Sequence, residues 1–395
     1  MKKIHIVQLL LASLLLATTN LLSPVYAIDI DKISDECYEQ YIAKEYEKSF
    51  ATCKKLADVD DYYGYYMLGL AYYYGRGVEE NDDKAFSYFQ RSAKQGFDKA
   101  MVKLGEMYRY GYGVEVNPES ALHWQTKAAK LGNPEGQFEA AVLLQYNERL
   151  PTDTQQALNW LHKSAAQDYA PAISEIGFFY DNGYGVEKDG KQACEWYKKS
   201  AEHGYRVAQY NLALCYEEGN ALEQNLPLAI KLFEQSAEQN YINSMDALGD
   251  IYSDNNYGLL DLEKAVYWYQ KAVDHGHLDS MNELGVIYEY EDKAYYKPEI
   301  AKELFEKTAA AGNTSGMYYL GRMYAFGKGI EQDYKKAIEW HLKAAELNDS
   351  DAQVSMYWRY YEGTGVEQDY KKALEWLKKA AENGNKDAYN NLGVM

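Results

Sequence analysis

The stretch LGRMYAFGKGIEQDYKKAIEWHLKAA, residues 320 to 345, decides the fold of this chain. Its first part carries Leu320, Met323 and Tyr324, whose i, i+3, i+4 spacing is typical of one buried helical stripe. A Gly-Lys-Gly turn follows, and Asp333 then offers an N-cap for a second helix. The stretch therefore predicts two antiparallel helices joined by a tight turn.

The same pattern returns every 36 residues along most of the chain. One alanine of the second helix recurs at Ala85, Ala121, Ala157, Ala193, Ala229, Ala265, Ala301, Ala337 and Ala373. A small residue of the first helix keeps the same step at Gly69, Gly105, Ala141, Gly177, Ala213, Gly249, Gly285, Gly321 and Gly393, and is interrupted only by Tyr357. Several anchors in one register predict an array of helical hairpins, because each repeat is one structural unit.

Residues that start and stop helices recur in the same register. N-cap types stand four residues before the recurring alanine, at Asn81, Asn117, Asp153, Asp189, Asn225, Asp261, Asp333 and Asp369. Types that tolerate a left-handed backbone end the second helix, at Gly96, Gly132, Asp168, Gly204, Asn240, Gly276, Gly312, Asn348 and Gly384. Gly-x-Gly turns join the two helices in five copies, and no segment has strand character.

These residues make the chain resemble the Sel1-like repeat family, relatives of the tetratricopeptide repeat. The resemblance implies an all-α fold, an α/α superhelical solenoid of about nine 36-residue hairpins over residues 64–387. It also implies an adaptor or scaffold that binds proteins and catalyses no reaction. Residues 28–63 are expected to form a degenerate capping repeat. Residues 388–395 are expected to form one lone helix, which either caps the array or marks a shortened chain.

The N-terminus has the pattern of a cleavable signal peptide over residues 1–27. Lys2 and Lys3 precede an apolar stretch, and small residues Val25 and Ala27 stand where a signal peptidase reads. No later stretch approaches the roughly 18 apolar residues that span a bilayer. We therefore expect an exported protein with no membrane insertion, periplasmic or secreted, of a Gram-negative bacterium.

The chain is strongly acidic. It has 60 Asp and Glu residues against 41 Lys and Arg residues, a formal net charge of −19. Such a surface repels nucleic acid and anionic headgroups, so the charge argues against binding to DNA, RNA or bare membrane. It favours a protein partner with a basic or extended segment. The family resemblance adds a cell-wall enzyme or cell-wall material as a narrower possibility.

Four cysteines allow three pairings in an exported chain. Cys194 and Cys215 lie symmetrically about the turn near Gly204, so antiparallel helices would bring them level. Cys37 and Cys53 bracket a turn in the same way. These two disulfides are the predicted pairing, and four buried, reduced thiols are the alternative.

Catalytic, metal and cofactor motifs give no convincing site. Cysteine-rich members of the resembling family have been linked to β-lactam binding and hydrolysis, so a β-lactam or peptidoglycan-related hydrolase is the alternative function. No Ser is followed three residues later by Lys, and Ser253-Asp254-Asn255 stands alone. The pair His275 and His277 is interpreted as a solvated helix end. We therefore predict no catalytic residue, no metal and no cofactor.

A binding face is expected along the first helices, whose exposed positions lie three residues before and one and four residues after the small anchor. These positions hold Tyr66, Leu70, Tyr73, Phe138, Val142, Asp181, Glu217, Asp246, Asp250, Glu289, Tyr318, Trp358 and Tyr361. Aromatic residues predominate at the two ends and acids in the middle. Such a face suits a segment that carries Lys or Arg. The alternatives are ordinary surface acids with aromatics packed between repeats, or binding by the irregular loops of the third, sixth and seventh copies.

Overall fold

The computed structural model describes residues 29–290 and 294–394. The predicted signal peptide lies outside these residues. Helices account for the regular structure of the described part, which contains no strand, so the predicted all-α solenoid of Sel1-type hairpins is confirmed. None of the helices described there has the length and apolar character needed to cross a membrane.

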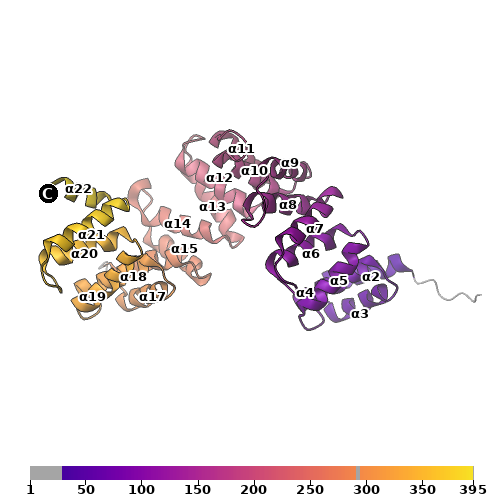
Figure 1. The fold of residues 1–395 in the computed structure, drawn as a ribbon, viewed down its shortest axis with the longest axis horizontal. Coiled ribbons are helices and arrows are strands. Elements are labelled where there is room, and N and C mark those ends of the chain that lie inside the picture. Colours follow the sequence, from indigo (N-terminus) through magenta and orange to yellow (C-terminus); the bar gives the residue numbers. More distant parts are fainter. Residues whose placement is uncertain (1–28, 291–293, 395) are drawn as a thin grey trace, which may run out of the picture. The chain divides into compact units, whose positions relative to one another are not determined.

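Helices follow one another as antiparallel hairpins (Figure 1). The first helices of the repeats are α4 (Tyr62–Tyr74), α6 (Asp98–Tyr110), α8 (Pro134–Tyr146), α10 (Ala170–Asn182), α12 (Arg206–Glu218), α14 (Ile242–Ser253), α16 (Leu278–Glu289), α18 (Thr314–Phe326) and α20 (Ser350–Glu362). The second helices are α5 (Asp82–Lys94), α7 (Pro118–Lys130), α9 (Thr154–Ala165), α11 (Gly190–Glu202), α13 (Leu226–Glu238), α15 (Leu262–Asp274), α17 (Pro298–Ala310), α19 (Tyr334–Glu346) and α21 (Tyr370–Glu382). The hairpin of α2 (Ile30–Ile42) and α3 (Tyr46–Ala57) precedes them, and α22 (Lys386–Val394) follows. Within the repeats, α4 packs on α5, α6 on α7, α8 on α9, α12 on α13, α14 on α15, α16 on α17, α18 on α19 and α20 on α21.

The chain forms two compact units. Unit 1 runs to Phe179 and includes Gly183–Glu187, whereas unit 2 comprises Tyr180–Asn182 and the chain from Lys188 onward. Within unit 2, α12 to α18 share one continuous apolar core. Within unit 1, α2 to α5 enclose a core around the first disulfide.

The capping pattern explains where the helices begin and end. All eight predicted Asn and Asp N-caps accept a backbone N–H of the first turn; Asp333, for example, accepts from Lys335 and Lys336 at 3.0 and 3.1 Å. The nine predicted stop residues all have a positive φ, including the non-glycines Asp168, Asn240 and Asn348. These boundaries are confirmed because short polar side chains satisfy the free N–H groups, and small residues tolerate the left-handed backbone.

A slot in the second helix explains why the first helix carries a small anchor. The residue four positions after the recurring alanine, called here the glycine-facing slot, packs directly against that anchor. A Cβ on Gly69 would lie 2.5 Å from the ring of Phe89, and one on Gly285 would lie 2.5 Å from that of Phe305. The slot is occupied in turn by Phe89, Gln125, Leu161, Tyr197, Phe233, Tyr269, Phe305, His341 and Leu377. The two helices approach so closely that a larger anchor would require the slot residue to move.

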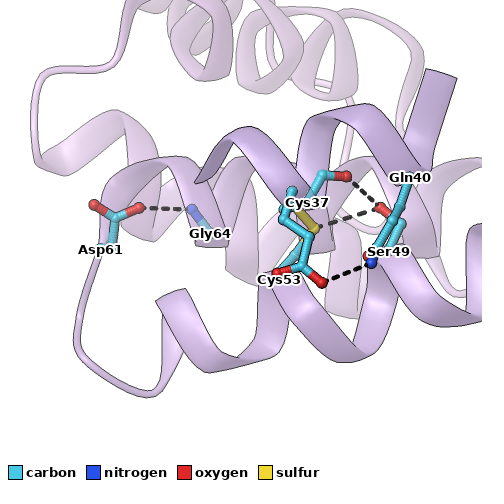
Figure 2. Close-up of a disulfide and its surroundings, with 7 residues drawn as sticks. Cys37, Gln40, Ser49, Cys53, Asp61 and Gly64 are labelled. Atoms are coloured by element: carbon cyan, nitrogen blue, oxygen red, sulfur yellow. Dashed lines mark hydrogen bonds between the residues drawn. A yellow bond between two sulfur atoms is a disulfide. The ribbon is translucent and has the colours of Figure 1, made fainter. Parts of the chain in front are cut away.

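Both predicted disulfides are present. Cys37 in α2 joins Cys53 in α3 with their Cα atoms 5.3 Å apart, and Cys194 in α11 joins Cys215 in α12 at 6.2 Å. Figure 2 shows the first of them, where Ser49 donates to the carbonyl of Cys37 at 2.9 Å. The described residues contain no free cysteine. Antiparallel helices bring cysteines level when they stand equally far from the connecting turn, as the sequence predicted.

Candidate protein-binding face

The predicted binding positions lie on first helices, which also contact one another across neighbouring repeats. Such contacts join α6 with α8 in unit 1, and α14 with α16 and α16 with α18 in unit 2. The acids among the predicted positions all lie in unit 2, on α10, α12, α14 and α16. Unit 2 therefore holds the charged part of the predicted face.

Neutral hydroxyl groups hold four of these acids in place. Tyr197 donates to Asp181 at 2.9 Å, and Tyr269 donates to Asp250 at 2.7 Å. Both tyrosines occupy the glycine-facing slot, so their rings fill the core while their hydroxyls reach the face. Tyr257 donates to Glu217 at 3.1 Å, and Ser280 donates to Asp246. Hydroxyl donors orient a carboxylate and leave its charge in place.

The acids crowd one another on α12, α14 and α16. Desolvation raises the pKa of Glu217 and of Asp250, and neighbouring carboxylates add to both shifts. Glu283 of α16 belongs to the same cluster, because its pKa is raised by desolvation and then by the charges of Asp250 and Asp246. Glu283 stands outside the three positions per repeat that the sequence pattern selected. Within the described residues, no Lys or Arg forms an ion pair with Glu217, Asp250 or Glu283.

His277 is a titratable group at the edge of this cluster. Its Nδ1 lies 3.3 Å from Asp246 and 2.8 Å from the hydroxyl of Ser280. The hydrogen bond to Asp246 raises the pKa of His277, against the opposing effect of desolvation. As the pH falls, His277 therefore gains a positive charge and Asp246 gains a partner.

Two predicted face residues are buried, which corrects their expected exposure. Glu289 is 1 % exposed and forms ion pairs with Arg322 of α18 and, at 3.9 Å, with Lys328. Leu70 is 8 % exposed and belongs to the core of unit 1. Arg322 of the neighbouring first helix contacts Glu289, and core residues of several helices surround Leu70, so neither side chain faces solvent. The negative charge of Glu289 is neutralised within the protein.

The aromatic positions in unit 1 mainly join neighbouring repeats. Tyr66 packs edge-on against Phe97 with ring centres 5.0 Å apart, and Phe138 packs against Tyr169 at 5.8 Å. Tyr73 donates to Glu106 at 2.9 Å, and Val142 is partly buried. These contacts are the kind expected if the aromatic residues pack between repeats and do not bind a partner.

The aromatic positions of unit 2 are more exposed. Trp358 is 41 % and Tyr361 is 37 % exposed, and their rings meet edge-on at 5.8 Å. Tyr318 is partly covered and lies over the ring of His341 at 5.8 Å. Large exposed aromatic surfaces of this kind suit a partner side chain.

An apolar cleft of about 670 Å³ adjoins the acidic cluster in unit 2. Leu262, Val286 and Ile287 line it, together with the ring of Tyr269 and the carboxylate of Glu283. Apolar atoms provide most of its wall. The cleft therefore offers a place for an apolar side chain next to uncompensated negative charge.

The motifs that were tested for chemistry have structural roles in the described part of the chain. Asp254 of the Ser-Asp-Asn stretch caps a short 3-10 helix, η1 (Asn255–Tyr257), by accepting the backbone N–H of Asn256 at 3.0 Å. His277 caps α16 and faces Asp246, whereas His275 ends α15. The described residues contain no group of three His, Cys, Asp or Glu side chains that could hold a metal ion.

The comparisons with known proteins agree on one repeat family. The Sel1 repeat family model matches residues 63–97, 98–133, 134–169, 170–205, 206–241, 243–277, 278–313, 314–349 and 352–385. Among curated protein sequences, none matches this chain. Proteins built from Sel1 repeats generally mediate protein–protein interactions and are typically scaffolds without enzymatic activity.

Two solved structures show the same architecture. One is a protective antigen of uropathogenic Escherichia coli strains that displays an SLR fold, at 26 % identity and a TM-score of 0.53, covering 92 % of this chain and 89 % of that one. The other is a Sel1 repeat protein from Oxalobacter formigenes, at 27 % identity and a TM-score of 0.58, covering 61 % of this chain and 99 % of that one. With nine matched repeats over most of its length, this chain belongs to the Sel1 repeat family.

Proposed function

We propose that this protein is an exported scaffold that binds a basic segment of a partner protein along the first helices of unit 2. One observation carries the proposal: within the described residues, Glu217, Asp250 and Glu283 form no ion pair with Lys or Arg, and neutral hydroxyls orient the first two. A charge that lacks an internal ion pair is available to an external cation. Lys or Arg side chains of a partner would supply it.

Neighbouring features fit the same kind of partner. The apolar cleft lined by Val286 and Ile287 would receive an apolar side chain from the bound segment. Trp358 and Tyr361 provide exposed aromatic surface farther along unit 2. An extended segment that alternates basic and apolar residues would contact the acids, the apolar cleft and the exposed aromatic rings. A cell-wall enzyme with an exposed basic stretch is one such partner.

Export is part of the proposal, and the cysteines support it. Disulfides form and persist in oxidising compartments, and all four cysteines of this chain are paired. The sequence pattern of residues 1–27 supports the same location. The proposed site of action is therefore the periplasm or the exterior of the cell.

Neutral isosteres test the acidic face without removing its hydrogen bonds. Glu217→Gln with Asp250→Asn keeps an acceptor for Tyr257 and Tyr269 and removes two charges. The probe is a fluorescent peptide of alternating lysine and leucine, followed by anisotropy at several salt concentrations. We expect roughly tenfold weaker binding by the double variant, with a smaller salt dependence.

A matched control removes two charges from second helices. Glu339 of α19 and Glu375 of α21 are both exposed, and changing both to Gln should leave peptide affinity within about twofold at moderate salt. Equal affinity of the wild type and the acidic-face variant would overturn the proposal. So would tight binding of a matched peptide in which glutamate replaces lysine.

A further inference from the structure

His341 occupies the glycine-facing slot in a way that no other copy does. It is 2 % exposed, and within the described part of the chain neither ring nitrogen forms a hydrogen bond of normal geometry, although the backbone of Tyr318 acts on the imidazole as an acceptor. Its ring packs against Gly321, where a Cβ would lie 2.4 Å from the imidazole. Five other copies fill the slot with Phe or Leu, and the tyrosines in it are held by Asp181 and Asp250. Packing alone therefore does not require a histidine here.

The imidazole is neutral in the structure because its surroundings oppose a proton. Burial lowers the pKa of His341 to about 4; the charge of Arg359 adds to the shift, the backbone of Tyr318 opposes it, and the charge of Arg322 adds to it again. A neutral imidazole keeps one N–H donor and one bare nitrogen acceptor. The backbone of Tyr318 can engage only one ring nitrogen, so the other lacks the partner that buried polar atoms nearly always have.

A pocket of about 410 Å³ opens beside this ring. It is bounded by α18, α19 and α20 and by the start of α22, and its lining includes His341, Arg322, Arg359 and Trp358. Arg359 is half-buried, and desolvation lowers the pKa of its guanidinium. Its guanidinium lies over the ring of Tyr334 at 5.3 Å, and no carboxylate of the described residues is within ion-pair distance. Nitrogen groups from three helices thus meet in one pocket.

Arg322 has part of its hydrogen-bonding capacity free. One end of its guanidinium pairs with Glu289, while its buried Nε has no partner among the described residues. Arg322 therefore presents a buried donor without an acceptor. An acceptor that entered the pocket would meet the guanidinium groups of both Arg322 and Arg359 in its lining.

Acidic residues line both ends of the pocket along α20, and Arg359 lies between them. Asp351 stands at its first turn, where Asn385 donates to it at 2.8 Å, and Asp387 lines the same end. Arg359 follows eight residues later, which is about 12 Å along the helix axis. Glu362 lies one turn beyond Arg359 and lines the pocket as well. A small, singly charged anion fits the cationic middle, whereas these acids oppose a larger or multiply charged one.

The geometry points to a binding site for a carboxylate group beside an aromatic or apolar side chain, as a peptide would present them. The planar guanidinium of Arg359 suits the two oxygens of a carboxylate. A carboxylate bound beside His341 would also favour the protonated imidazole, which donates from both ring nitrogens. Trp358, 41 % exposed, would cover the apolar part of the ligand. The carboxylate comes either from a chain terminus or from an Asp or Glu side chain. This site shares Trp358 with the proposed face but none of its acids, Glu217, Asp250 and Glu283, which would bind cations.

Small probes test the site without knowledge of the partner. The probe is N-acetyl-phenylalanine, and the control ligand is its neutral amide; both are titrated to 10 mM by saturation-transfer NMR on the full mature protein, a concentration chosen on the order of a weak fragment's dissociation constant. We expect the acid to bind at least about tenfold more tightly than the amide. N-acetyl-glutamyl-phenylalaninamide distinguishes a side-chain carboxylate from a terminal one.

Variants separate binding from folding. His341→Phe installs the residue that other copies carry in this slot and removes both nitrogens, while Arg359→Gln removes the free charge. Each should reduce affinity for the acid about tenfold and leave affinity for the amide unchanged. Arg206→Gln, an exposed arginine of α12, is the matched control and should behave as the wild type.

The melting temperature of each variant shows that the fold is intact. His341→Phe should melt no lower than the wild type, because Phe89 and Phe305 already pack against glycine in the same way. Three outcomes overturn the proposal: failure of both carboxylate probes to bind at 10 mM, equal affinity of the acid that binds and the neutral amide, or unchanged affinity in both folded variants. None of these outcomes depends on whether a basic segment binds the acidic face.

Discussion

Two pockets on equivalent helices differ in how their polar groups are satisfied. In unit 1, Gln125 occupies the glycine-facing slot of α7 and donates to the carbonyl of Val102 at 3.0 Å, while its own buried oxygen has no partner among the described residues. Around it, Lys103 pairs with Glu106 and Arg109 pairs with Glu139, both at 2.7 Å. In unit 2, His341 occupies the same slot of α19 with no hydrogen bond of normal geometry, beside Arg359, which has no ion pair in the described structure.

The difference teaches how a repeat protein can make a site without changing its frame. The backbone of the two hairpins is built by the same caps and turns, and the slot faces a glycine in both. The side chains alone determine whether the charged groups of a pocket form ion pairs with one another or remain unpaired. A pocket whose cations are all paired, as Lys103 and Arg109 are, belongs to the scaffold, whereas one with an unpaired cation is a candidate for an anionic ligand.

The largest expected effect is the pH dependence of stability contributed by His341. Because the pKa of His341 is lowered to about 4 in the folded state, the unfolded chain takes up the proton first as the pH falls. Its stabilising contribution is present above pH ~6.5 and is lost as the pH falls toward 4. Relative to His341→Phe, the wild type should lose up to about 3 kcal/mol between pH 7 and pH 4. Urea unfolding at both pH values measures this difference.

The pH control is the equivalent slot of unit 1. Gln125→Leu removes a polar side chain that does not titrate, so its effect on stability should be the same at pH 7 and pH 4. A wild type and a His341→Phe variant that lose stability in parallel would show that the imidazole is solvated or paired in solution.

The next effect concerns the glycines that face the two slots. Gly321→Ala would place a Cβ 2.4 Å from the rigid ring of His341, whereas Gly105→Ala would meet the flexible end of Gln125 at 2.6 Å. We expect Gly321→Ala to destabilise by about 1 to 3 kcal/mol and Gly105→Ala by clearly less. Thermal unfolding of the two variants compares them directly. Equal losses would mean that the helices, and not the slot residues, resist the added methyl group.

A smaller effect separates the paired arginine from the unpaired one. Arg109→Gln leaves Glu139 without its partner, and burial already raises the pKa of Glu139 despite that pairing. We expect a loss of about 1 kcal/mol for Arg109→Gln and no measurable loss for Arg359→Gln. Denaturation midpoints in the absence of ligand provide the measurement. A comparable loss in Arg359→Gln would reveal an internal partner for that guanidinium.

The smallest expected effect concerns Glu283, an acid that has no ion pair among the described residues. The raised pKa of Glu283 means that its charged form is disfavoured in the folded protein, so its contribution to stability is lost as the pH rises through that pKa. Glu283→Gln should therefore stabilise at pH 7 by less than about 1 kcal/mol, and the gain should vanish in acid. Melting curves across this pH range test the sign. A destabilised variant at neutral pH would indicate a cation next to Glu283.

The sequence by itself determined the repeat, the helix boundaries and the disulfides. Each of these depends on chemistry within a few residues or on simple hairpin symmetry. Asp333 and Asp369 cap helices because their side chains reach N–H groups two or three residues ahead. Cys194 and Cys215 meet because they stand at equal heights on adjacent helices.

Only the tertiary structure decided which polar side chains have partners. Tyr269 and Asp250 are 19 residues apart in sequence, and Arg322 and Glu289 are 33 apart, so no local pattern relates them. The same positional rule that selected Asp250 on the face also selected Glu289, which a neighbouring helix buries. The sequence could not reveal the role of His341 for the same reason. Whether a histidine in an apolar slot has hydrogen-bond partners is known only when every surrounding atom is placed. Burial and hydrogen-bond satisfaction are sums over all neighbours in space, whereas caps, turns and period are properties of adjacent residues.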